Sequence, residues 1–503
     1  MALLGIDLGT SAVKALVLTS EGRVLGRGTA GYPIEQPQTG WAEQSPAAWW
    51  AATIAAVSNA LAGSGRQPPA ITAIGLSGQM HGTVLLDEAG ALLYPAVIWP
   101  DRRSGRQVAE LTAAIGAQRL IRLAGSPLAT GFQAATIRWF QQERPDVWDK
   151  VAHILAPKDY LRWRLTGEFN SEASDGSGTL LLDVRRREWS AELLEALDIA
   201  PRLMPANVPS TAVAGRLTAE AAAGLGLVAG TPVVAGAADT ACGLLGSGVI
   251  DEGSLLLAIS SGGQLVAPAT RVVNDLAGRS HTFCGALEPT QGQASWYRMA
   301  ATLAAGLSLR WLRDRVFQLP GEGAYKVMTA LAAQAPPGAN GLLFLPYLLG
   351  ERTPHMDPRA RGLFLGLTVE HGRPELVRAV MEGVALACLD AFEALGQAGA
   401  RPARIIMAGG GARSKLWRQI VAGVFNLPVL ALATEEQAAV GAALLAGAGL
   451  GLFEAAAAAK AWVAYEDQVE PDPRAHEVYS RLLGIYRDAY RKHRADFAEL
   501  WSI

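Results

Sequence analysis

Two acidic residues, Asp7 and Asp239, each follow an apolar run that is typical of a buried strand. Small polar residues come after both of them, with Gly9-Thr10-Ser11 behind Asp7 and Thr240 behind Asp239. Burying a carboxylate at a strand end is costly unless a metal ion or a donor compensates it, and a single such acid is usually a structural cap. Two acids beside matched polar turns indicate separate tasks, in which one orients Mg²⁺ and the other accepts a proton from an attacking hydroxyl.

Three turns of small residues, each after a predicted strand, are candidate phosphate sites: residues 8–11, 260–263 and 409–412. Glycine allows the backbone to approach a ligand closely, and serine or threonine adds a hydroxyl beside exposed N–H groups. One such turn is weak evidence because structural turns are far commoner, but three favour a polyphosphate site. No lysine of the chain follows a glycine, which excludes the Gly-Lys-Ser/Thr phosphate loop.

Two further polar clusters are candidate hydroxyl-binding sites. His81 follows Gln79 and Met80 between two glycines, which favours an exposed loop that binds a hydroxyl over a hydrogen-bonded core histidine. Asp101 and Arg102 form either a surface ion pair of negligible energy or a sugar-binding pair, and the neighbouring Trp99 favours the second interpretation.

The elements that position these residues are predicted from apolar runs and turn residues. Apolar runs at 3–6 and 13–18 predict a hairpin, and a similar pair at 255–259 and 264–267 predicts a second hairpin. The two form an internal repeat whose halves meet near residue 245. Later, strands alternate with helices from residue 404 onward, which argues for an α/β sheet with ligands at the carboxyl ends of its strands.

One early helix has clear boundary and packing signals. Ser45 is its predicted N-cap and Pro46 its first residue. Apolar side chains recur at helical spacing and predict one buried stripe, formed by Trp50, Ile54, Val57 and Leu61.

Composition limits the class of protein. The 503 residues are 50% hydrophobic and 18% charged, which indicates a well-packed globular protein with two large domains or three smaller ones. A net charge of −2 provides no bulk attraction to nucleic acid or anionic membranes. Three widely spaced cysteines form neither a disulfide framework nor a zinc site. With no basic region before the first apolar run, a signal peptide is not expected, and we predict a cytoplasmic protein.

Several of these segments resemble the FGGY family of carbohydrate kinases, and the resemblance spans essentially the whole chain in order. The matching motifs are Gly-Ile-Asp-Leu-Gly-Thr-Ser at 5–11, Gly-Gln-Met-His-Gly at 78–82, the Asp239 strand, Leu-Pro-Tyr-Leu-Leu-Gly-Glu-Arg-Thr-Pro-His at 345–355, Gly-Leu-Phe-Leu-Gly-Leu-Thr at 362–368 and Gly-Gly-Gly-Ala-Arg-Ser at 409–414. The resemblance implies an α/β, actin-like ATPase (ribonuclease H-like) fold with two similar domains around an interdomain cleft. It also implies the activity, which is ATP- and Mg²⁺-dependent phosphorylation of a ketopentose, D-xylulose above all.

By the same resemblance, the site residues acquire roles. Asp239 is the general base, and Asp7 and Asp239 are the catalytic and metal-binding acids. The implied sugar-binding residues are Gln79, Met80, His81, Trp99, Asp101, Asp239 and Thr240. The implied nucleotide-binding residues are Gly9, Thr10, Ser11, Ser260, Ser261, Gly262, Gly410, Gly411 and Ala412. Residues 1–245 are expected to form the sugar-binding domain with the first phosphate turn, and residues 246–503 the nucleotide-binding domain with the second.

Four positions depart from the family pattern, and they leave the sugar open. Ser260 replaces a glycine, Pro100 and Thr240 stand where asparagine is usual, and Thr136 stands where a lysine is usual. One alternative is therefore a kinase of another ketose or polyol, such as ribulose. A remote alternative is a non-catalytic actin-like regulatory or assembly protein. We expect no nucleic-acid or membrane partner; a homodimer is the common default for such enzymes, and the oligomeric state stays open.

Overall fold

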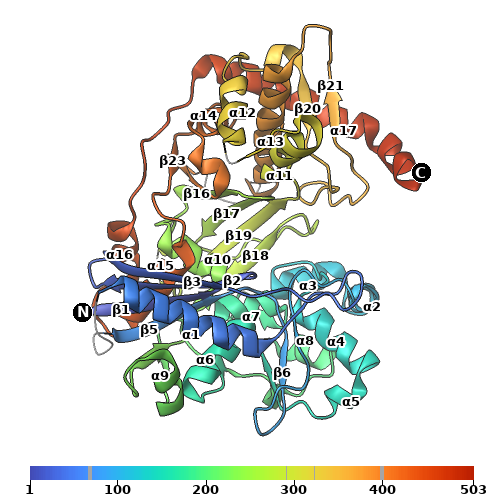
Figure 1. The fold of residues 1–503 in the computed structure, drawn as a ribbon. Coiled ribbons are helices and arrows are strands. Elements are labelled where there is room, and N and C mark those ends of the chain that lie inside the picture. The colour runs from blue at the N-terminus through green and yellow to red at the C-terminus, as the bar shows by residue number, and fades with distance from the viewer. Residues whose placement is uncertain (66–70, 291, 322, 397–401) are drawn as a thin grey trace. The chain divides into compact units, whose positions relative to one another are not determined.

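The computed structural model describes residues 1–65, 71–290, 292–321, 323–396 and 402–503 (Figure 1). These residues form two compact units. Unit 1 comprises Met1–Asp251, Pro268–Tyr297 and Glu436–Val463, and unit 2 comprises Glu252–Ala267, Arg298–Glu435 and Ala464–Ile503.

Unit 1 combines a central sheet with helices on both faces. Its strands are β1 (Ala2–Leu8), β2 (Ala12–Thr19), β3 (Val24–Gly31), β4 (Glu43–Gln44), β5 (Ile71–Gly78), β6 (Val84–Leu86), β7 (Ala96–Val97), β8 (His153–Leu155), β9 (Asn170–Ser171), β10 (Leu182–Asp183), β11 (Glu188–Trp189), β12 (Ala206–Asn207), β13 (Val213–Arg216), β14 (Pro232–Val234), β15 (Ala237–Ala238) and β18 (His281–Cys284). Its helices are α1 (Pro46–Gly63), α2 (Gly105–Ile115), α3 (Ala117–Ala124), α4 (Gln133–Glu143), α5 (Pro145–Trp148), α6 (Pro157–Thr166), α7 (Ala173–Thr179), α8 (Ala191–Ala196), α9 (Ala219–Leu225), α10 (Asp239–Gly246), α15 (Gln437–Gly449) and α16 (Ala455–Trp462).

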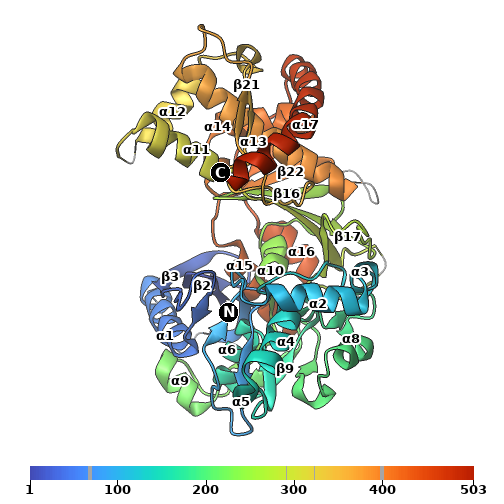
Figure 2. The same cartoon turned by 90° about the vertical axis from the view of Figure 1, so that its right-hand side faces the viewer.

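The main sheet of unit 1 has the strand order β13-β14-β5-β1-β2-β3, and β15 also pairs with β5. β1 and β2 are antiparallel, as the first hairpin predicts, while β5 runs parallel to β1, β14 and β15. Gly5 pairs with Leu16 of β2, and Leu16 pairs with Arg27 of β3. Because successive side chains of a strand point to opposite faces, Gly28, which follows Arg27, faces away from the side of Gly5. A Cβ on Gly5 would meet a backbone oxygen of α15, and one on Gly28 of β3 would meet a backbone oxygen of α1. α1 and α15 therefore cover opposite faces of the sheet (Figures 1 and 2).

The buried stripe predicted for α1 was mostly wrong. Of the four predicted residues, Val57 alone is fully buried, and the buried face is instead formed by Trp49, Ala52, Thr53, Ala56, Val57 and Ala60. The reason is close backbone packing, since a Cβ on Gly28 would lie 1.9 Å from the carbonyl oxygen of Ala56. Small side chains must therefore face the sheet, and the larger Trp50, Ile54 and Leu61 flank this contact.

Unit 2 contains its own sheet and a large helical core. Its strands are β16 (Ser254–Ile259), β17 (Gly263–Ala269), β19 (Trp296–Thr302), β20 (Leu343–Leu345), β21 (Leu363–Leu365), β22 (Arg404–Ala408) and β23 (Val429–Ala431), with the ends of β17 and β19 reaching the unit boundary. Its helices are α11 (Gly306–Trp311), α12 (Ala324–Ala332), α13 (Arg373–Gly396), α14 (Lys415–Phe425) and α17 (Pro473–Ser502). α13 is buried along most of its length, and α17 contributes Tyr479, Tyr486 and Phe497 to the same core.

The two sheets repeat one arrangement, which confirms the predicted internal repeat. In unit 1 the β1–β2 hairpin has β5 parallel to β1, and in unit 2 the β16–β17 hairpin has β22 parallel to β16. The predicted boundary near residue 245 separates these two repeats along the chain. The compact units differ from this division along the chain. Glu436–Val463 belongs to unit 1, where the alanine-rich helix α15 packs against the glycines of β1 and β5.

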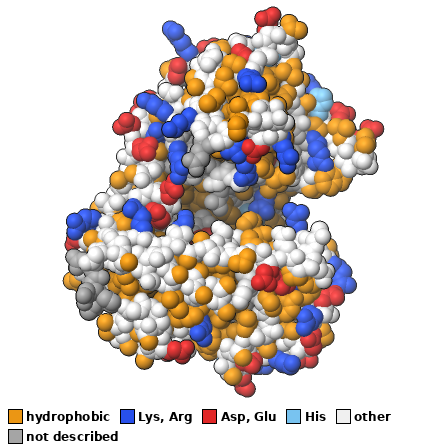
Figure 3. Space-filling model, in the orientation of Figure 1, with side chains coloured by type: hydrophobic (Ala, Val, Ile, Leu, Met, Phe, Trp, Pro, Cys, Tyr) orange, Lys and Arg blue, Asp and Glu red, His pale blue; other side chains and the backbone are white. Residues whose placement is uncertain are grey.

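Helix length and surface charge relate to the prediction that the protein has no membrane or nucleic-acid partner. In the part of the chain that the structure describes, no helix combines the length and the apolar character needed to span a bilayer. Both signs of charge occur across the face visible in Figure 3, in keeping with the net charge of −2.

Candidate active site

Asp7 lies near the carboxyl end of β1, opposite Lys14 of β2 and beside Ser77 of β5. The hydroxyl of Ser77 donates a hydrogen bond to Asp7 Oδ1 at 2.9 Å. Burial raises the pKa of Asp7, and the Ser77 hydrogen bond and the positive charge of Lys14 act against that rise. Asp7 is therefore an acid at the strand end, held in place by one hydroxyl, as its position after an apolar run predicts.

Asp239 follows β15, and β15 lies on the opposite side of β5 from β1. Because all three strands are parallel, Asp7 and Asp239 come to the same edge of the sheet. The backbone N–H and the hydroxyl of Thr240 donate to Asp239 Oδ1 at 2.6 and 3.1 Å. Burial raises the pKa of Asp239 to about 7, and the negative charge of Asp7 adds to the effect. The structure thus brings together the two acids that the sequence singled out.

This carboxylate pair fits a divalent cation. Burial raises the pKa of both carboxyl groups, and the negative charge of Asp7 raises the pKa of Asp239 further. A bound cation would relieve this cost of ionising them. Mg²⁺ is bound in proteins by one or two carboxylates, with the remaining ligands supplied by phosphate and water. Within the described residues, no cluster of three or more acidic, histidine or cysteine side chains forms a complete protein cage. A site built from two acids and a substrate phosphate matches the donors present here.

The first small-residue turn, Gly9-Thr10-Ser11, joins β1 to β2 next to Asp7. Its backbone is anchored from outside, since the Gln44 amide donates to the Thr10 carbonyl at 2.7 Å. The indole N–H of Trp99 donates to Thr10 Oγ1 at 2.9 Å, although 45% of Trp99 is exposed. A residue predicted for the sugar and a residue predicted for phosphate are therefore in direct contact.

Gln79, Met80 and His81 follow β5 at the same edge of the sheet. His81 has a positive φ of 74°, its Nδ1 lies 2.7 Å from the carbonyl oxygen of Gly178, and its ring centroid lies 3.8 Å from that of Phe132. Met80 is buried, and the Tyr297 hydroxyl donates to its sulfur at 3.5 Å. The buried Gln79 side chain donates to the Gln44 amide oxygen at 2.9 Å. Sequence reasoning gave no site role to Phe132 or Tyr297, because tertiary packing brings both of them here from distant parts of the chain.

The expected Asp101–Arg102 pair was wrong, because the partner is Arg103. Arg103 Nε donates to both carboxylate oxygens of Asp101, at 3.0 and 2.9 Å, and its Nη2 donates to Glu43 at 2.7 Å. Both side chains of the Asp101–Arg103 pair are only 1% exposed. The backbone N–H of Ala42 also donates to Asp101 Oδ2 at 2.7 Å. Asp101 thus faces protein donors on both oxygens and supports the loop that carries Trp99.

In unit 2 the structure brings the other two small-residue turns together. β16 and β22 are parallel neighbours, so the turns at 260–263 and 409–412 leave the sheet side by side. Gly409 has a φ of +77°, and a Cβ there would lie 2.7 Å from the carbonyl oxygen of Ile259. The carbonyl of Ser260 accepts from the N–H of Gly306, at the start of α11 (2.8 Å). Two turns that are 149 residues apart in sequence therefore share one wall.

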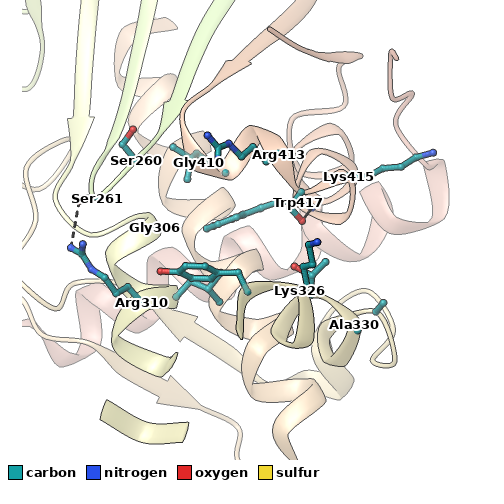
Figure 4. Close-up of a pocket in the computed structure, with 17 residues that line it drawn as sticks. Ser260, Ser261, Gly306, Arg310, Lys326, Ala330, Gly410, Arg413, Lys415 and Trp417 are labelled. Carbon is teal, nitrogen blue, oxygen red and sulfur yellow. Dashed lines mark hydrogen bonds between the residues drawn. The ribbon is translucent and has the colours of Figure 1, made fainter. Parts of the chain in front are cut away.

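That wall lines a pocket of about 780 Å³ within unit 2 (Figure 4). Ser260, Ser261, Gly410 and Gly411 line it, while Gly262 and Ala412 belong to the same turns without lining it. The remaining lining residues are Ile259, Gly306, Leu309, Arg310, Tyr325, Lys326, Thr329, Ala330, Ala333, Arg413, Ser414, Lys415 and Trp417. Apolar side chains beside several cations suit a ligand with a flat apolar ring and a phosphate chain.

Two of the four cations that line this pocket, Arg310 and Lys326, were missed by sequence reasoning. Arg310 comes from α11, where its guanidinium donates to Ser261 Oγ at 3.5 Å, and Lys326 comes from α12 (Figure 4). Neither residue belongs to a glycine-rich turn or a spacing pattern, so no sequence signal marks them.

Two of the four departures from the family pattern, Ser260 and Thr240, are accommodated in the fold. Ser260 has no positive φ, so its turn does not require glycine at that position. Thr240 provides two hydrogen bonds to Asp239, as described above. Thr136 is buried in α4, and within the described residues its hydroxyl has no hydrogen-bond partner.

Comparison with known proteins places this geometry in context. The family model described as "FGGY family of carbohydrate kinases, N-terminal domain" matches residues 2–246, and the corresponding C-terminal model matches residues 271–450. The xylulose kinase of Escherichia coli (strain K12) is 38% identical over 421 residues, covering 84% of each chain. The xylulose kinase of Bacillus subtilis (strain 168) is 36% identical over 489 residues, covering 97% of this chain and 96% of that protein.

A solved structure is also similar to this chain over nearly its whole length. The crystal structure of xylulose kinase from Rhodospirillum rubrum superimposes with a TM-score of 0.91 at 31% sequence identity, covering 99% of this chain and 100% of that one. This similarity confirms the predicted α/β, actin-like (ribonuclease H-like) fold.

Proposed function

The chain belongs to the FGGY family of carbohydrate kinases, and from this membership we propose that it transfers the γ-phosphoryl group of ATP to D-xylulose. The products are ADP and D-xylulose 5-phosphate. The names of its relatives support the sugar. The observation that carries the proposal is the carboxylate pair Asp7 and Asp239 at one sheet edge, beside the loop of Met80 and His81.

Phosphoryl transfer depends mainly on positioning and charge neutralisation, so few residues act chemically. Asp239 accepts the proton of the attacking sugar hydroxyl, and its pKa of about 7 suits a base at neutral pH. Asp7 and Asp239 would hold Mg²⁺, which would supply positive charge to the transferred phosphate. Thr10 faces the phosphate chain, with its hydroxyl oriented by Trp99.

The proposed binding roles divide along the chain. The proposed sugar-binding residues lie within 1–245 and are Met80, His81, Gln79, Trp99 and Thr240, of which Thr240 contacts Asp239, while Asp101 supports the loop of Trp99 through Arg103. Nucleotide-binding residues lie within 246–503, where the pocket of unit 2 takes ADP against the turns at 260–263 and 409–412. The first turn, Gly9 to Ser11, contributes to phosphate binding from the first part of the chain.

We expect kcat/KM for the sugar, at subsaturating MgATP, to fall as the pH drops through about 7. Burial raises the pKa of Asp239 to about 7, so below that pH the carboxyl is protonated and accepts no proton. In the Asp7→Asn variant, the fall of the remaining kcat/KM should occur at a lower pH, because the negative charge that raises the Asp239 pKa is removed. A wild-type profile that is flat between pH 5.5 and 8 would contradict the assignment of Asp239 as the base.

His81→Asn should reduce kcat/KM for the sugar by about 10-fold, the effect of losing one substrate hydrogen bond, and should leave the KM for ATP within about 2-fold. Asparagine tolerates the positive φ of His81 better than alanine does, so the loop keeps its conformation. Steady-state kinetics with each substrate varied in turn measures both effects. Equal losses toward sugar and ATP would mean that His81 has a structural task only.

The substrate is tested with a panel of D-xylulose, D-ribulose, L-ribulose, gluconate and glycerol, with coupled detection of ADP. D-xylulose should give the highest kcat/KM by at least about 10-fold, the lower end of the cost of leaving one buried polar group unpaired. A higher value for another member would assign the protein to that sugar. Polymerisation without sugar-dependent ADP release would instead support a regulatory or assembly protein.

The proposed compartment is the cytoplasm, and the proposed assembly is a homodimer. The three cysteines, Cys242, Cys284 and Cys388, are free and buried, and unpaired thiols are typical of a reducing compartment.

A further inference from the structure

The backbone that leads into Asp239 is held from two sides by a buried polar cluster. The carbonyl of Ala235 accepts hydrogen bonds from Lys158 Nζ at 3.3 Å and from Arg162 Nη1 at 2.8 Å. Three residues later, the N–H of Ala238 donates to the hydroxyl of Ser174 at 2.9 Å. Ala238 directly precedes Asp239, so the Ser174 hydrogen bond is the last anchor before the catalytic carboxylate.

The Ser174 hydroxyl is oriented for this task by Glu172. It donates its single proton to Glu172 Oε1 at 2.8 Å, which leaves its lone pairs to accept from Ala238. Glu172 is fixed in turn, because it caps α7 by accepting from the N–H groups of Ser174 and Asp175 at 2.7 and 2.9 Å. The Ser210 hydroxyl donates to the same carboxylate at 3.2 Å. The hydrogen-bond direction therefore runs from Ala238 through Ser174 to a fixed anion.

The charged side chains around Glu172 are buried together. Lys158 Nζ lies 2.7 Å from Asp159, 3.2 Å from Asp175 and 3.7 Å from Glu172, and all four side chains are at most 1% exposed. Arg162 contacts Asp159 at 2.9 Å. Burial raises the pKa of Asp175 well above its usual range, while the neighbouring Lys158 acts to lower it. Two cations and three acidic side chains thus share one cluster that is closed to solvent.

We propose that Ser174 is a positioning residue that sets the place of Asp239 through the Ala238 N–H. The inference rests on the proposed function, in which Asp239 is the base. A catalytic group displaced by about 1 Å can lose activity on the order of 10²-fold, and Ser174 acts on the residue next to that group. Removing the hydroxyl leaves the Ala238 N–H without its acceptor and Glu172 without one donor.

The test compares Ser174→Ala with Ser177→Ala, a matched control one turn further along α7. Ser177 is equally buried, donates to the carbonyl of Ser174 at 2.8 Å and accepts from a backbone N–H, but that N–H belongs to Cys284. Both variants lose one buried hydroxyl and should show similar falls in Tm. S174A should lower kcat by about 10-fold with both KM values within 2-fold, whereas S177A should keep kcat within 2-fold. Equal kcat values for the two variants would overturn the proposal.

Two further variants separate this inference from the proposed function. S174T keeps the hydroxyl and should restore kcat to within 2-fold; if it does not fold, the comparison of the two alanine variants still decides. In an Asp239→Asn background, S174A should have no further effect on kcat, because its effect passes through the Asp239 carboxylate. A full additional loss in that background would show that Ser174 acts elsewhere. If Asp239→Asn alone left kcat unchanged, that result would reject Asp239 as the base. The comparison of Ser174→Ala with Ser177→Ala would be unaffected by it.

Discussion

Asp239→Asn should lower kcat by about 10²–10⁴-fold, the usual effect of removing a general base, while the Kd for ATP stays within about 2-fold. The amide keeps the shape of the carboxylate and an oxygen that accepts from Thr240, so the start of α10 is preserved. What is lost is the group that accepts the sugar proton. Coupled ADP detection measures turnover, and calorimetric titration with ATP measures binding.

The thermal stability of this variant provides an internal control. Burial raises the folded-state pKa of Asp239 to about 7, so the folded protein binds a proton more tightly than the unfolded chain does. Wild-type stability therefore decreases as the pH rises from the ordinary carboxyl range through about 7, and above that pH the variant should have the higher Tm. Near-wild-type turnover in a folded Asp239→Asn protein would exclude Asp239 as the base.

Lys158→Met should destabilise the protein by about 3–5 kcal/mol, because it removes a cation from a buried cluster and leaves anions without compensation. Lys158 is fully buried between Asp159 and Asp175. Methionine keeps the apolar stem, so the loss is chiefly one of charge and hydrogen bonds. Urea unfolding followed by circular dichroism measures the difference in the free energy of unfolding.

The pH dependence of that loss has a definite sign. Burial acts to raise the pKa of Asp159, but Lys158 and Arg162 outweigh it and hold the pKa below its usual value. That depressed pKa contributes stability above the carboxyl range of the unfolded chain, and this stability is lost as the pH falls through the folded pKa. The difference between wild type and Lys158→Met should therefore be largest at neutral pH and shrink toward pH 4.

Lys460→Met is the matched control for Lys158→Met. Lys460 also pairs with an aspartate, Asp251 at 3.1 Å, but the two side chains are 59% and 44% exposed. An exposed ion pair contributes less than about 1 kcal/mol, so this variant should unfold close to wild type. If Lys158→Met cost no more than Lys460→Met, the buried cluster would have no special part in holding the fold.

Local residue patterns predicted several elements of the fold. Apolar runs joined by glycine turns predicted both hairpins, and α1 begins at Pro46 directly after Ser45, as expected. Asp7 and Asp239 stood out because an acid at the end of a buried strand needs a compensating partner. These features depend on neighbours in sequence, and local rules describe such features well.

Long-range packing decided the rest. The buried face of α1 depends on glycines of β3, which allow backbone contact that helical periodicity does not reveal. Arg103, and not Arg102, pairs with Asp101 because Glu43 and Trp41 surround its guanidinium. Arg310 and Lys326 line the pocket of unit 2 from helices that carry no motif.

The sequence by itself thus determined that the two acids and the three small-residue turns lie at strand ends, because residue types and strand ends are local properties. The tertiary structure alone decided how those groups are held. Asp239 owes its place to Ser174, Lys158 and Arg162, which lie 65 to 81 residues before it in the chain and reach it only when α6 and α7 pack beside β15. Such contacts arise from the closure of long loops around a shared core, and no residue pattern along the chain encodes them visibly.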